Sequence, residues 1–454
     1  MTQQKNPATI SRRTFLEKTT LVAAGAAAAS ASRSEAQIND ARGKLPEGLR
    51  VGHVGLGIRG VELLQGSREI EGIETVVACD LYKGHLVNAG ELTGGQIETT
   101  GDYRAILDRK DIDAVVVAVP DHQHKRVLLD ALDAGKHVYI EKPLTHKLAD
   151  GKEMVSAVKK SGLKVQVGSQ YLSMAATEEA RDFLMGGGIG KVVMVDAKIY
   201  RQNSQSACYY PIPPDASTDT VNWREFLVGA PSQNWDPKRF FQWRLFWDYS
   251  GGLATDLFVH LVSATHYLLG VRGPKSVFAF GDIFLWKDYR EVPDQLAAVA
   301  NYPEEFMLKL TTSACNGHEG PQLTFYGTEG TLEFNGGSYT VYYEPVSESF
   351  AYSTKSFPSA TRDQIRSKLG LDENMRPLGG APATAGEPVE FRAQAAEGST
   401  TAHLRNFFDS IRNGTEPVED IEFGVRAVNV AHMVNLSCTE SRMVNRDPKS
   451  ERIG

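Results

Sequence analysis

Apolar and polar residues alternate in blocks over residues 50–169, and the blocks have the lengths of strands and helices. Short, mostly apolar segments predict strands at residues 50–56, 73–80, 111–120, 137–143 and 163–169. Apolar residues with helical spacing lie between them, at residues 61–70, 124–135 and 149–162. The segment DIDAVVVAVP is almost continuously apolar, which is typical of a strand buried on both faces. The alternation predicts an α/β fold with a doubly wound parallel sheet over residues 49–170.

The first predicted strand leads into a G-x-G-x-x-G pattern, GLGIRG, which is followed by a helical pattern. The first glycine permits a tight turn, the second lets the backbone approach a pyrophosphate, and the third lets the helix pack against the strand. Free N–H groups at the helix N-terminus then bind phosphate. We therefore predict a dinucleotide site made by Gly55, Leu56, Gly57, Ile58, Arg59 and Gly60.

Asp80 ends the second predicted strand, 20 positions after Gly60. An acidic residue at this spacing accepts hydrogen bonds from the ribose hydroxyls of a dinucleotide. A carboxylate also repels a 2′-phosphate, so Asp80 favours NAD over NADP as the cofactor.

Composition and charge limit the class of protein. The 454 residues predict two or three domains. A net charge of −7 argues against a nucleic-acid partner, because phosphate binding needs a basic surface. The cysteines are widely spaced and form no zinc motif, although one or two disulfides remain open; they are Cys79, Cys208, Cys315 and Cys438.

The N-terminus has the pattern of a twin-arginine export signal. Arg12 and Arg13 precede Phe15 and Leu16, and a short apolar segment follows at residues 21–31. This segment is shorter than the ~20 residues that cross a bilayer, so a signal peptide fits better than a stable membrane anchor. We predict a signal peptide over residues 1–36, a linker over 37–48, and export to the periplasm by the twin-arginine machinery.

Three residues have the chemistry to oxidise an alcohol. Asp256 and His260 are four positions apart on a predicted helix and so share a face. Histidine titrates near neutral pH, as a general base should. Lys142 follows a predicted strand and would lie at the edge where parallel sheets bind ligands. An Asp and a His alone make a weak metal site, and we predict no metal.

Aromatic residues are concentrated over residues 222–252. Aromatic faces suit the C–H faces of sugar rings, although such residues also build hydrophobic cores. The candidates for substrate contact are Tyr171, Arg201, Trp243 and Arg244.

GLGIRG, VAVPDHQH (117–124), EKPLTH (141–146) and GGLATDLFVH (251–260) occur in the order found in the Gfo/Idh/MocA oxidoreductases. The resemblance covers roughly residues 48–450. It implies a Rossmann domain followed by an α/β domain, over residues 171–454, that binds substrate. The second domain would contain a large, mostly antiparallel open sheet. That sheet often serves as an oligomer interface, so we expect a homo-oligomer.

The resemblance also implies roles for individual residues. Lys142 and His260 match the catalytic lysine and histidine of the family, and Asp256 matches its active-site aspartate. The bond before Pro143 would often be cis. Further residues expected at the cofactor are Pro120, His124, Glu141 and Lys142. The segment GSQYLS has Tyr171 where the family often has a basic residue, so the substrate preference does not carry over.

An export signal on a nucleotide-binding protein suggests that NAD is bound tightly before export. A periplasmic enzyme would then have to restore the redox state of its cofactor in each turnover. The leading hypothesis is an oxidoreductase acting on a sugar, polyol or glycoside hydroxyl. The alternatives are a glycoside hydrolase, lyase or epimerase that uses transient oxidation, and a non-catalytic sugar- or nucleotide-binding protein. Residues 355–400 have the composition of a long insertion or loop.

Overall fold

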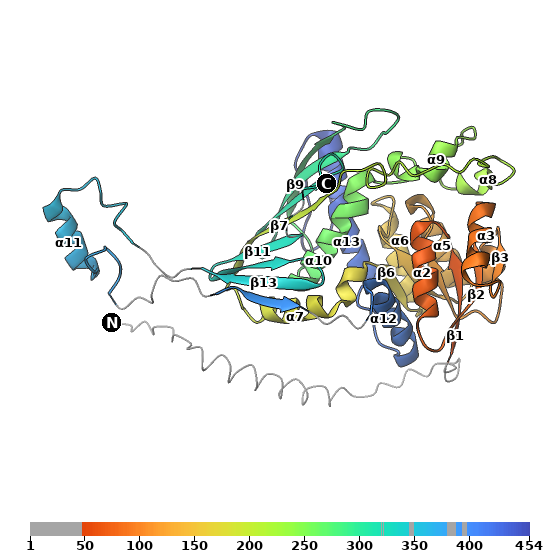
Figure 1. The fold of residues 1–454 in the computed structure, drawn as a ribbon, viewed down its shortest axis with the longest axis horizontal. Helices are drawn as coiled ribbons and strands as arrows, with labels where there is room; N and C mark the ends of the chain where they lie inside the picture. Colours follow the sequence, from red (N-terminus) through yellow and green to blue (C-terminus); the bar gives the residue numbers. More distant parts are fainter. Residues whose placement is uncertain (1–47, 319, 321, 345–348, 379–386, 393–396) are drawn as a thin grey trace. The chain divides into compact units, whose positions relative to one another are not determined.

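The computed structural model describes residues 48–318, 320, 322–344, 349–378, 387–392 and 397–454. The predicted signal peptide and all but the last residue of the predicted linker lie outside the described residues. Residues 47–454 make one compact unit. It contains two sheets, each accompanied by helices (Figure 1).

The first sheet is the predicted doubly wound sheet. Its order is β3-β2-β1-β4-β5-β6, and every neighbouring pair is parallel. This is the strand order of dinucleotide-binding folds, in which the direction of winding reverses between β1 and β4. The strands are β1 (Leu49–Val54), β2 (Ile73–Cys79), β3 (Glu98–Thr100), β4 (Ala114–Val117), β5 (His137–Glu141) and β6 (Val165–Gly168). All four residues of β4 are buried, as its apolar sequence predicts.

Helices connect these strands. They are α2 (Ile58–Arg68), α3 (Lys83–Leu92), α4 (Arg104–Leu107), α5 (His124–Asp133) and α6 (Asp150–Ser161). The helical spacing predicted α2, α5 and α6. Helices α3 and α4 were not predicted: α4 has only four residues, and α3 buries only Ala89. A late helix, α12 (Ser399–Asn413), comes from the predicted second domain but packs against α2.

The second sheet has the order β14-β13-β12-β11-β7-β10-β9-β8-β15. Among the described pairs only β7 and β10 run parallel, so the sheet is mostly antiparallel, as the resemblance implied. The strands are β7 (Val192–Tyr200), β8 (Ser276–Asp282), β9 (Gln295–Asn301), β10 (Met307–Ser313), β11 (Leu323–Gly327), β12 (Gly330–Phe334), β13 (Ser338–Tyr343), β14 (Val389–Arg392) and β15 (Val444–Asn445).

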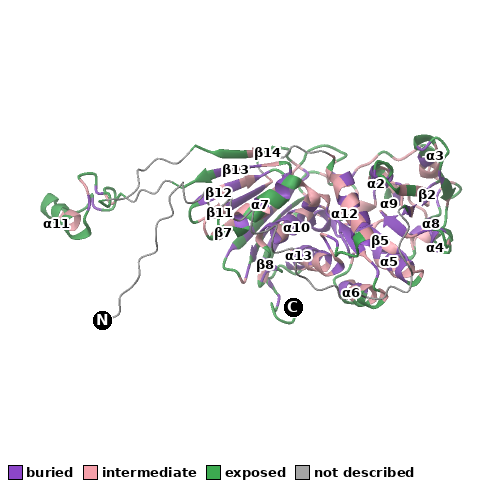
Figure 2. Cartoon of the chain, turned by 90° about the horizontal axis from the view of Figure 1, so that it is seen from below, coloured by how far each residue is buried: buried purple, intermediate pink, exposed green. Residues whose placement is uncertain are grey.

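Buried residues alternate with exposed ones along several strands of this sheet, so one face is buried and the other is exposed; Figure 2 shows both classes on the strands. Residues of β9 alternate strictly between exposed and buried. Helices on the buried side include α7 (Ala175–Met185), α10 (Val259–Leu269) and α13 (Ile421–Glu440), which contact one another and the sheet. The predicted insertion at residues 355–400 contains helix α11 (Ser359–Leu369) and strand β14, so it is not a plain loop. The composition did not predict either element. In α11 no residue is buried, so the helix has no buried apolar face that a sequence pattern could reveal.

Residues 202–250, named here the cap segment, contact the first sheet at the carboxyl ends of its strands. The segment includes the short helices α8 (Trp223–Phe226) and α9 (Pro237–Phe241). The Lys83 N–H donates to the Thr220 carbonyl over 2.9 Å, and the Asn222 N–H donates to the Leu81 carbonyl over 2.8 Å. The aromatic residues predicted from the sequence mostly form a separate core here, which includes Tyr82, the residue before α3. Core packing, rather than sugar binding, accounts for most of them.

Candidate active site

Lys142 and Asp256, predicted from distant segments, lie side by side. The Lys142 ammonium donates to Asp256 twice, to the carboxylate Oδ1 over 3.0 Å and to the backbone carbonyl over 2.7 Å. Lys142 directly follows β5, and its bond to Pro143 is cis, as the resemblance implied. The Arg244 guanidinium lies 3.4 Å from the same carboxylate oxygen. Burial opposes ionisation of Asp256, but the two cations hold its pKa well below the usual range.

Asp256 lies in a π-helical turn, η4 (Ala254–Phe258), which continues directly into α10. Such turns insert a residue into a helix and recur at functional sites. His260 lies in the first turn of α10, so both residues project from one continuous helical segment. The turn is a local feature that the predicted helical spacing did not anticipate.

His260 is partly buried beside Lys142. Its ring makes an edge contact with the Tyr171 ring, with centroids 5.7 Å apart. Burial first, and then the positive charge of Lys142, lower its pKa well below the usual value. Its buried Nδ1 has no hydrogen-bond partner among the described residues. A neutral imidazole with a free nitrogen is in the state required to accept a proton.

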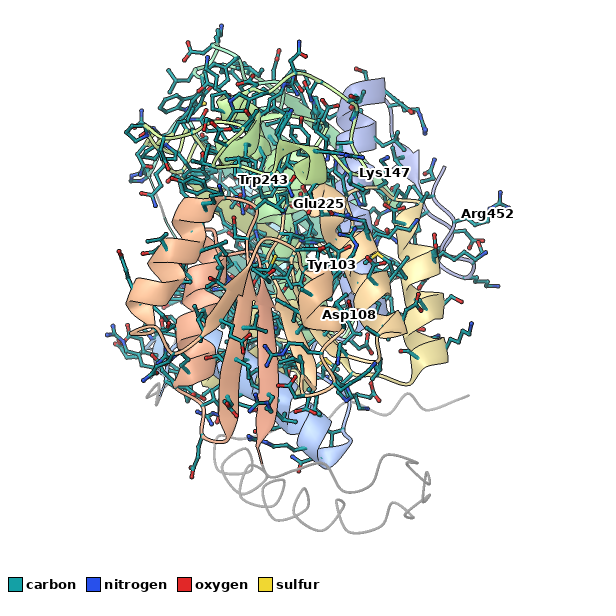
Figure 3. The ribbon with its side chains drawn as sticks, turned by 90° about the vertical axis from the view of Figure 1, so that its right-hand side faces the viewer. Tyr103, Asp108, Lys147, Glu225, Trp243 and Arg452 are labelled. Carbon is teal, nitrogen blue, oxygen red and sulfur yellow. The ribbon has the colours of Figure 1, made fainter. Side chains whose placement is uncertain are left out.

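The other predicted substrate residues surround this group. Arg201 is exposed and acts electrostatically on His260. The Arg244 guanidinium stacks on the Trp243 ring at 4.2 Å. Trp243, in the cap segment, lies above the parallel strands in Figure 3. Of these candidates, Arg244 contacts Asp256 and Tyr171 contacts His260, whereas Trp243 is connected to the group through Arg244.

The glycine-rich loop has the geometry that a dinucleotide requires. Gly55 has φ +94°, and a Cβ there would meet the Ala118 carbonyl oxygen at 2.4 Å. A Cβ at Gly60 would lie 2.0 Å from the Gly55 oxygen. A Cβ at Gly57 would meet nothing within 4 Å, so the space beside it is open. Gly57 is also the N-cap of α2, and no side chain caps that helix N-terminus. The loop therefore fits a pyrophosphate beside Gly57.

Asp80 forms a hydrogen bond with this loop. Its Oδ2 accepts the Leu56 N–H over 2.7 Å, and its Oδ1 accepts the Tyr82 N–H over 2.8 Å. His85 Nδ1 lies 3.1 Å from Oδ1. A carboxylate has about four acceptor positions, so Asp80 retains capacity for a ribose hydroxyl.

Arg59 and Glu141, both predicted at the cofactor, pair with each other. The Arg59 Nε donates to Glu141 Oε1 over 2.8 Å, and its Nη1 donates to Thr400 Oγ1 over 2.8 Å. The buried Arg59 Nη2 lacks a partner among the described residues, as does Oε1 of Gln170. Sequence reasoning missed Gln170, although it is adjacent to Tyr171. Such orphaned polar atoms fit a site that a polar ligand completes.

His124 and its neighbours support the backbone around the site. The two ring nitrogens of His124 lie 2.7 Å from the Pro143 carbonyl and 2.9 Å from the Val119 carbonyl. His124 thus connects the loop containing Pro120 to the loop containing Lys142. His122 is buried and contacts the Phe226 carbonyl through Nε2 over 2.8 Å.

Within the described ranges, no three His, Cys, Asp or Glu side chains form a group able to hold a metal ion. In the same part of the chain, none of the helices combines the length and apolar character needed to cross a bilayer. The four cysteines are unpaired.

Two family models match the chain. Residues 49–169 match "Oxidoreductase family, NAD-binding Rossmann fold", and residues 181–445 match "Oxidoreductase family, C-terminal alpha/beta domain", both of Gfo/Idh/MocA type. Residues 170–180 lie between the two matches.

Curated relatives share part of the sequence. Inositol 2-dehydrogenase of Salmonella typhimurium is 28% identical over 36% of this chain and 49% of the relative. Levoglucosan dehydrogenase of Pseudarthrobacter phenanthrenivorans is 27% identical over 52% of this chain and 59% of the relative. Glycosyl hydrolase family 109 protein 1 of Shewanella sp. is 28% identical over 25% and 26%, respectively. The match spans about half the length of the inositol dehydrogenase.

Solved structures share the fold. Levoglucosan dehydrogenase in complex with NADH and levoglucosan aligns with a TM-score of 0.63 and 18% identity, covering 88% of this chain and 99% of that one. Aldose–aldose oxidoreductase from Caulobacter crescentus aligns with a TM-score of 0.62 and 20% identity, covering 88% and 99%.

Proposed function

The chain belongs to the Gfo/Idh/MocA oxidoreductase family, and from this premise we propose that it transfers a hydride between a nicotinamide cofactor and a hydroxyl-bearing carbon of a sugar, polyol or glycoside. The observation that carries the proposal is the Lys142–Asp256 pair beside the neutral His260. Three groups of complementary chemistry come together here from segments that are far apart in the sequence.

Each group has a distinct task in this proposal. The Lys142 ammonium, held 3.0 Å from the Asp256 carboxylate, orients the substrate oxygen and stabilises the negative charge that develops on it. His260 accepts the hydroxyl proton on a ring nitrogen. The ionised Asp256 holds Lys142 in place and stabilises the imidazolium once it forms. The bound nicotinamide supplies the hydride acceptor.

NAD is the favoured cofactor, and its retention by the protein is part of the proposal. Asp80 beside the glycine-rich loop disfavours a 2′-phosphate. The cap segment contacts the loops that follow β2 and β4, where the cofactor of such folds lies. A cofactor covered in this way would exchange slowly. This fits export through the twin-arginine pathway with NAD already bound, which is the localisation that we propose from Arg12 and Arg13.

The first experiment is to recover the protein from the periplasm without added cofactor and to denature it. Mass spectrometry of the released small molecules should find NAD(H) in near-stoichiometric amount and little NADP(H). Recovery from the periplasm tests the export signal at the same time. An empty protein that binds added NAD weakly contradicts cofactor loading before export.

A second activity, transient oxidation within a glycoside hydrolase, lyase or epimerase cycle, is supported by the similarity to the glycosyl hydrolase family 109 protein. The same residues would serve it, because that cycle also begins by removing a hydroxyl proton. Net product analysis separates the two activities. An oxidoreductase changes the oxidation state of its carbohydrate products, whereas the alternative releases a leaving group or an epimer with no net redox change.

A further inference from the structure

Helix α13 contacts both segments that carry the Lys142–Asp256 pair. Lys142 lies on the loop after β5, and Asp256 lies in η4, 114 positions later. Helix α13 packs against η4 and against α6, the helix that follows the Lys142 loop. His432 and Asn435 on α13 are three positions apart, so their side chains project from one face of the helix. One helix is therefore placed to hold both segments.

His432 holds the loop that carries Lys142. Its Nε2 lies 2.9 Å from Oγ1 of Thr145, which is three residues after Lys142. Both side chains are buried, with 9% and 1% of their surfaces exposed. Helix α13 also approaches this loop closely at Gly424, where a Cβ would lie 3.2 Å from Cδ2 of Leu144. The loop therefore rests on α13 through a hydrogen bond and through close packing.

Asn435 holds the turn that leads to Asp256. Its Nδ2 donates to the Gly251 carbonyl over 2.8 Å. The next residue, Gly252, has φ +62°, and a Cβ there would lie 2.9 Å from Cβ of Val292. The turn is therefore tightly packed, and η4 begins only three residues after Gly251. A movement of this turn is carried into η4 and so to Asp256.

The contact between Lys142 and Asp256 tolerates little movement of either segment. The ammonium donates to the carboxylate over 3.0 Å and to the backbone carbonyl over 2.7 Å. A shift of about 1 Å takes such a contact outside hydrogen-bonding range. Misplacing a reacting group by about 1 Å can slow a reaction about 100-fold. The supports of the two segments therefore matter for the rate.

We propose that His432 and Asn435 are positioning residues, which fix the distance between the Lys142 ammonium and the Asp256 carboxylate from one face of α13. This inference rests on the proposed function, in which that ammonium orients the substrate oxygen. Each residue acts through the segment that it holds and touches neither substrate nor cofactor. Their loss should therefore slow hydride transfer while leaving binding almost unchanged.

The kinetic test uses Asn435→Leu and His432→Leu, which remove the two hydrogen bonds and roughly keep the side-chain volumes. We expect kcat to fall about 10- to 100-fold in each, with KM for the carbohydrate and the NAD(H) content within about twofold of the wild type. His432→Gln, whose amide nitrogen can reach Thr145, should be faster than His432→Leu. Asn413→Leu, at an exposed asparagine of α12, is the matched control and should keep the wild-type kcat. A wild-type kcat in both leucine variants of α13 overturns the proposal.

A second comparison separates positioning from a general loss of stability. Asn435→Leu is combined with Lys142→Met, in which the contact with Asp256 is already absent. Because Asn435 acts through that contact, adding Asn435→Leu should lower kcat by less than about twofold in this background. A fall of about 10- to 100-fold in both backgrounds overturns the proposal.

Crystal structures of the wild type and Asn435→Leu measure the contact without any substrate. We expect the distance from Lys142 Nζ to Asp256 Oδ1 to exceed about 3.5 Å in the variant. Thr145→Val, which loses only the hydroxyl facing His432, should lengthen this distance too and replaces any α13 variant that does not fold. An unchanged distance overturns the proposal. If the distance lengthens but no carbohydrate is turned over, the proposed function fails and the positioning role stands.

Discussion

Lys142 has surroundings that make its replacement informative. Its side chain is 11% exposed, and its ammonium donates to the Asp256 carboxylate and to the Asp256 backbone carbonyl. Lys142→Met keeps the length of the side chain and removes the charge. We expect kcat to fall by about 10²–10⁴, because stabilisation of the developing negative charge is lost.

The NAD(H) content of the purified Lys142→Met protein should stay near that of the wild type. Lys152→Met is the matched control, because Lys152 is exposed on α6, and it should keep full activity. Unchanged biological function in Lys142→Met would instead support a non-catalytic binding protein.

The pH dependence of His260 follows from its surroundings. Burial and Lys142 lower its pKa well below 6.5, so the imidazole is neutral throughout the ordinary working range. As a base, His260 must be unprotonated, and it loses activity only when pH falls below its own pKa. We therefore expect kcat/KM for oxidation to show no loss centred near pH 6.5, measured between about pH 5.5 and 8. An acid limb centred near 6.5 would mean that His260 is not shielded as the structure shows.

Some of the candidate residues could be predicted from sequence and others could not, for a physical reason. Lys142, Asp256 and His260 were predicted because each belongs to a short motif with a fixed place on an element. Gln170 was missed, because its importance comes from a buried side-chain oxygen without a hydrogen-bond partner among the described residues, and no sequence motif reveals such an atom. The pairing of Arg59 with Glu141 was missed for a similar reason, because the two residues are 82 positions apart in the sequence.

In the glycine-rich loop, one glycine is required by the packing of the protein and another lies beside open space that a ligand could fill. A Cβ at Gly57 would meet nothing within 4 Å, whereas a Cβ at Gly60 would lie 2.0 Å from the Gly55 oxygen. Gly57→Val should therefore keep the thermal stability of the wild type and lose bound NAD(H), because the valine fills the space for the pyrophosphate. Gly60→Ala should lower the stability by about 1–3 kcal/mol through overpacking.

Calorimetry and cofactor analysis of both variants test this contrast. Full NAD(H) content in a well-folded Gly57→Val protein would show that the pyrophosphate does not approach the loop at Gly57.

At the level of elements, the parallel sheet was predicted best, because most of its strands contain buried apolar runs. The exception is β3, which was not predicted because it has only three residues, all of them polar. The cap segment shows what could not be predicted from composition. Its many aromatic residues were considered for sugar binding, but most of them form a core with Tyr82, the residue before α3. Composition does not distinguish an aromatic core from an aromatic binding surface, because the difference lies in which partner covers the rings.

The whole molecule contains many buried titratable groups, and they limit its stability at both ends of the pH range. Burial lowers the pKa of several histidines, namely His53, His122, His266, His403 and His432. Below pH 6.5 the unfolded chain binds more protons than the folded one, so stability falls as pH decreases.

Glu419 has the opposite effect on the pH dependence of stability. It is fully buried, accepts the Ser263 hydroxyl over 3.1 Å, and has its pKa raised from 4.5 to about 8 by burial. Between these values the folded protein binds the extra proton, so stability falls as pH rises. Glu419→Gln should be more stable than the wild type by about 2–4 kcal/mol at pH 8 and by much less near pH 5, measured by urea unfolding. An equal difference at both pH values would contradict a raised pKa for Glu419.

The exposed face of the second sheet bears on the assembly of the molecule. Phe278 and Phe280 on β8 are 52% and 68% exposed, and Val299 on β9, directly opposite Phe278, is 43% exposed. Contiguous apolar residues on a sheet face favour association, since a second copy would remove them from water. We therefore expect a homo-oligomer that uses this face.

Phe278→Asp combined with Phe280→Asp should dissociate that oligomer, because two carboxylates cannot be buried without partners. Light scattering at fixed protein concentration would show the smaller mass. Tyr352→Asp, at a tyrosine that is 82% exposed outside the sheet, is the control and should keep the wild-type mass. A double variant with the wild-type mass would show that the subunits associate through another surface, and a monomeric wild type would show that this face remains open.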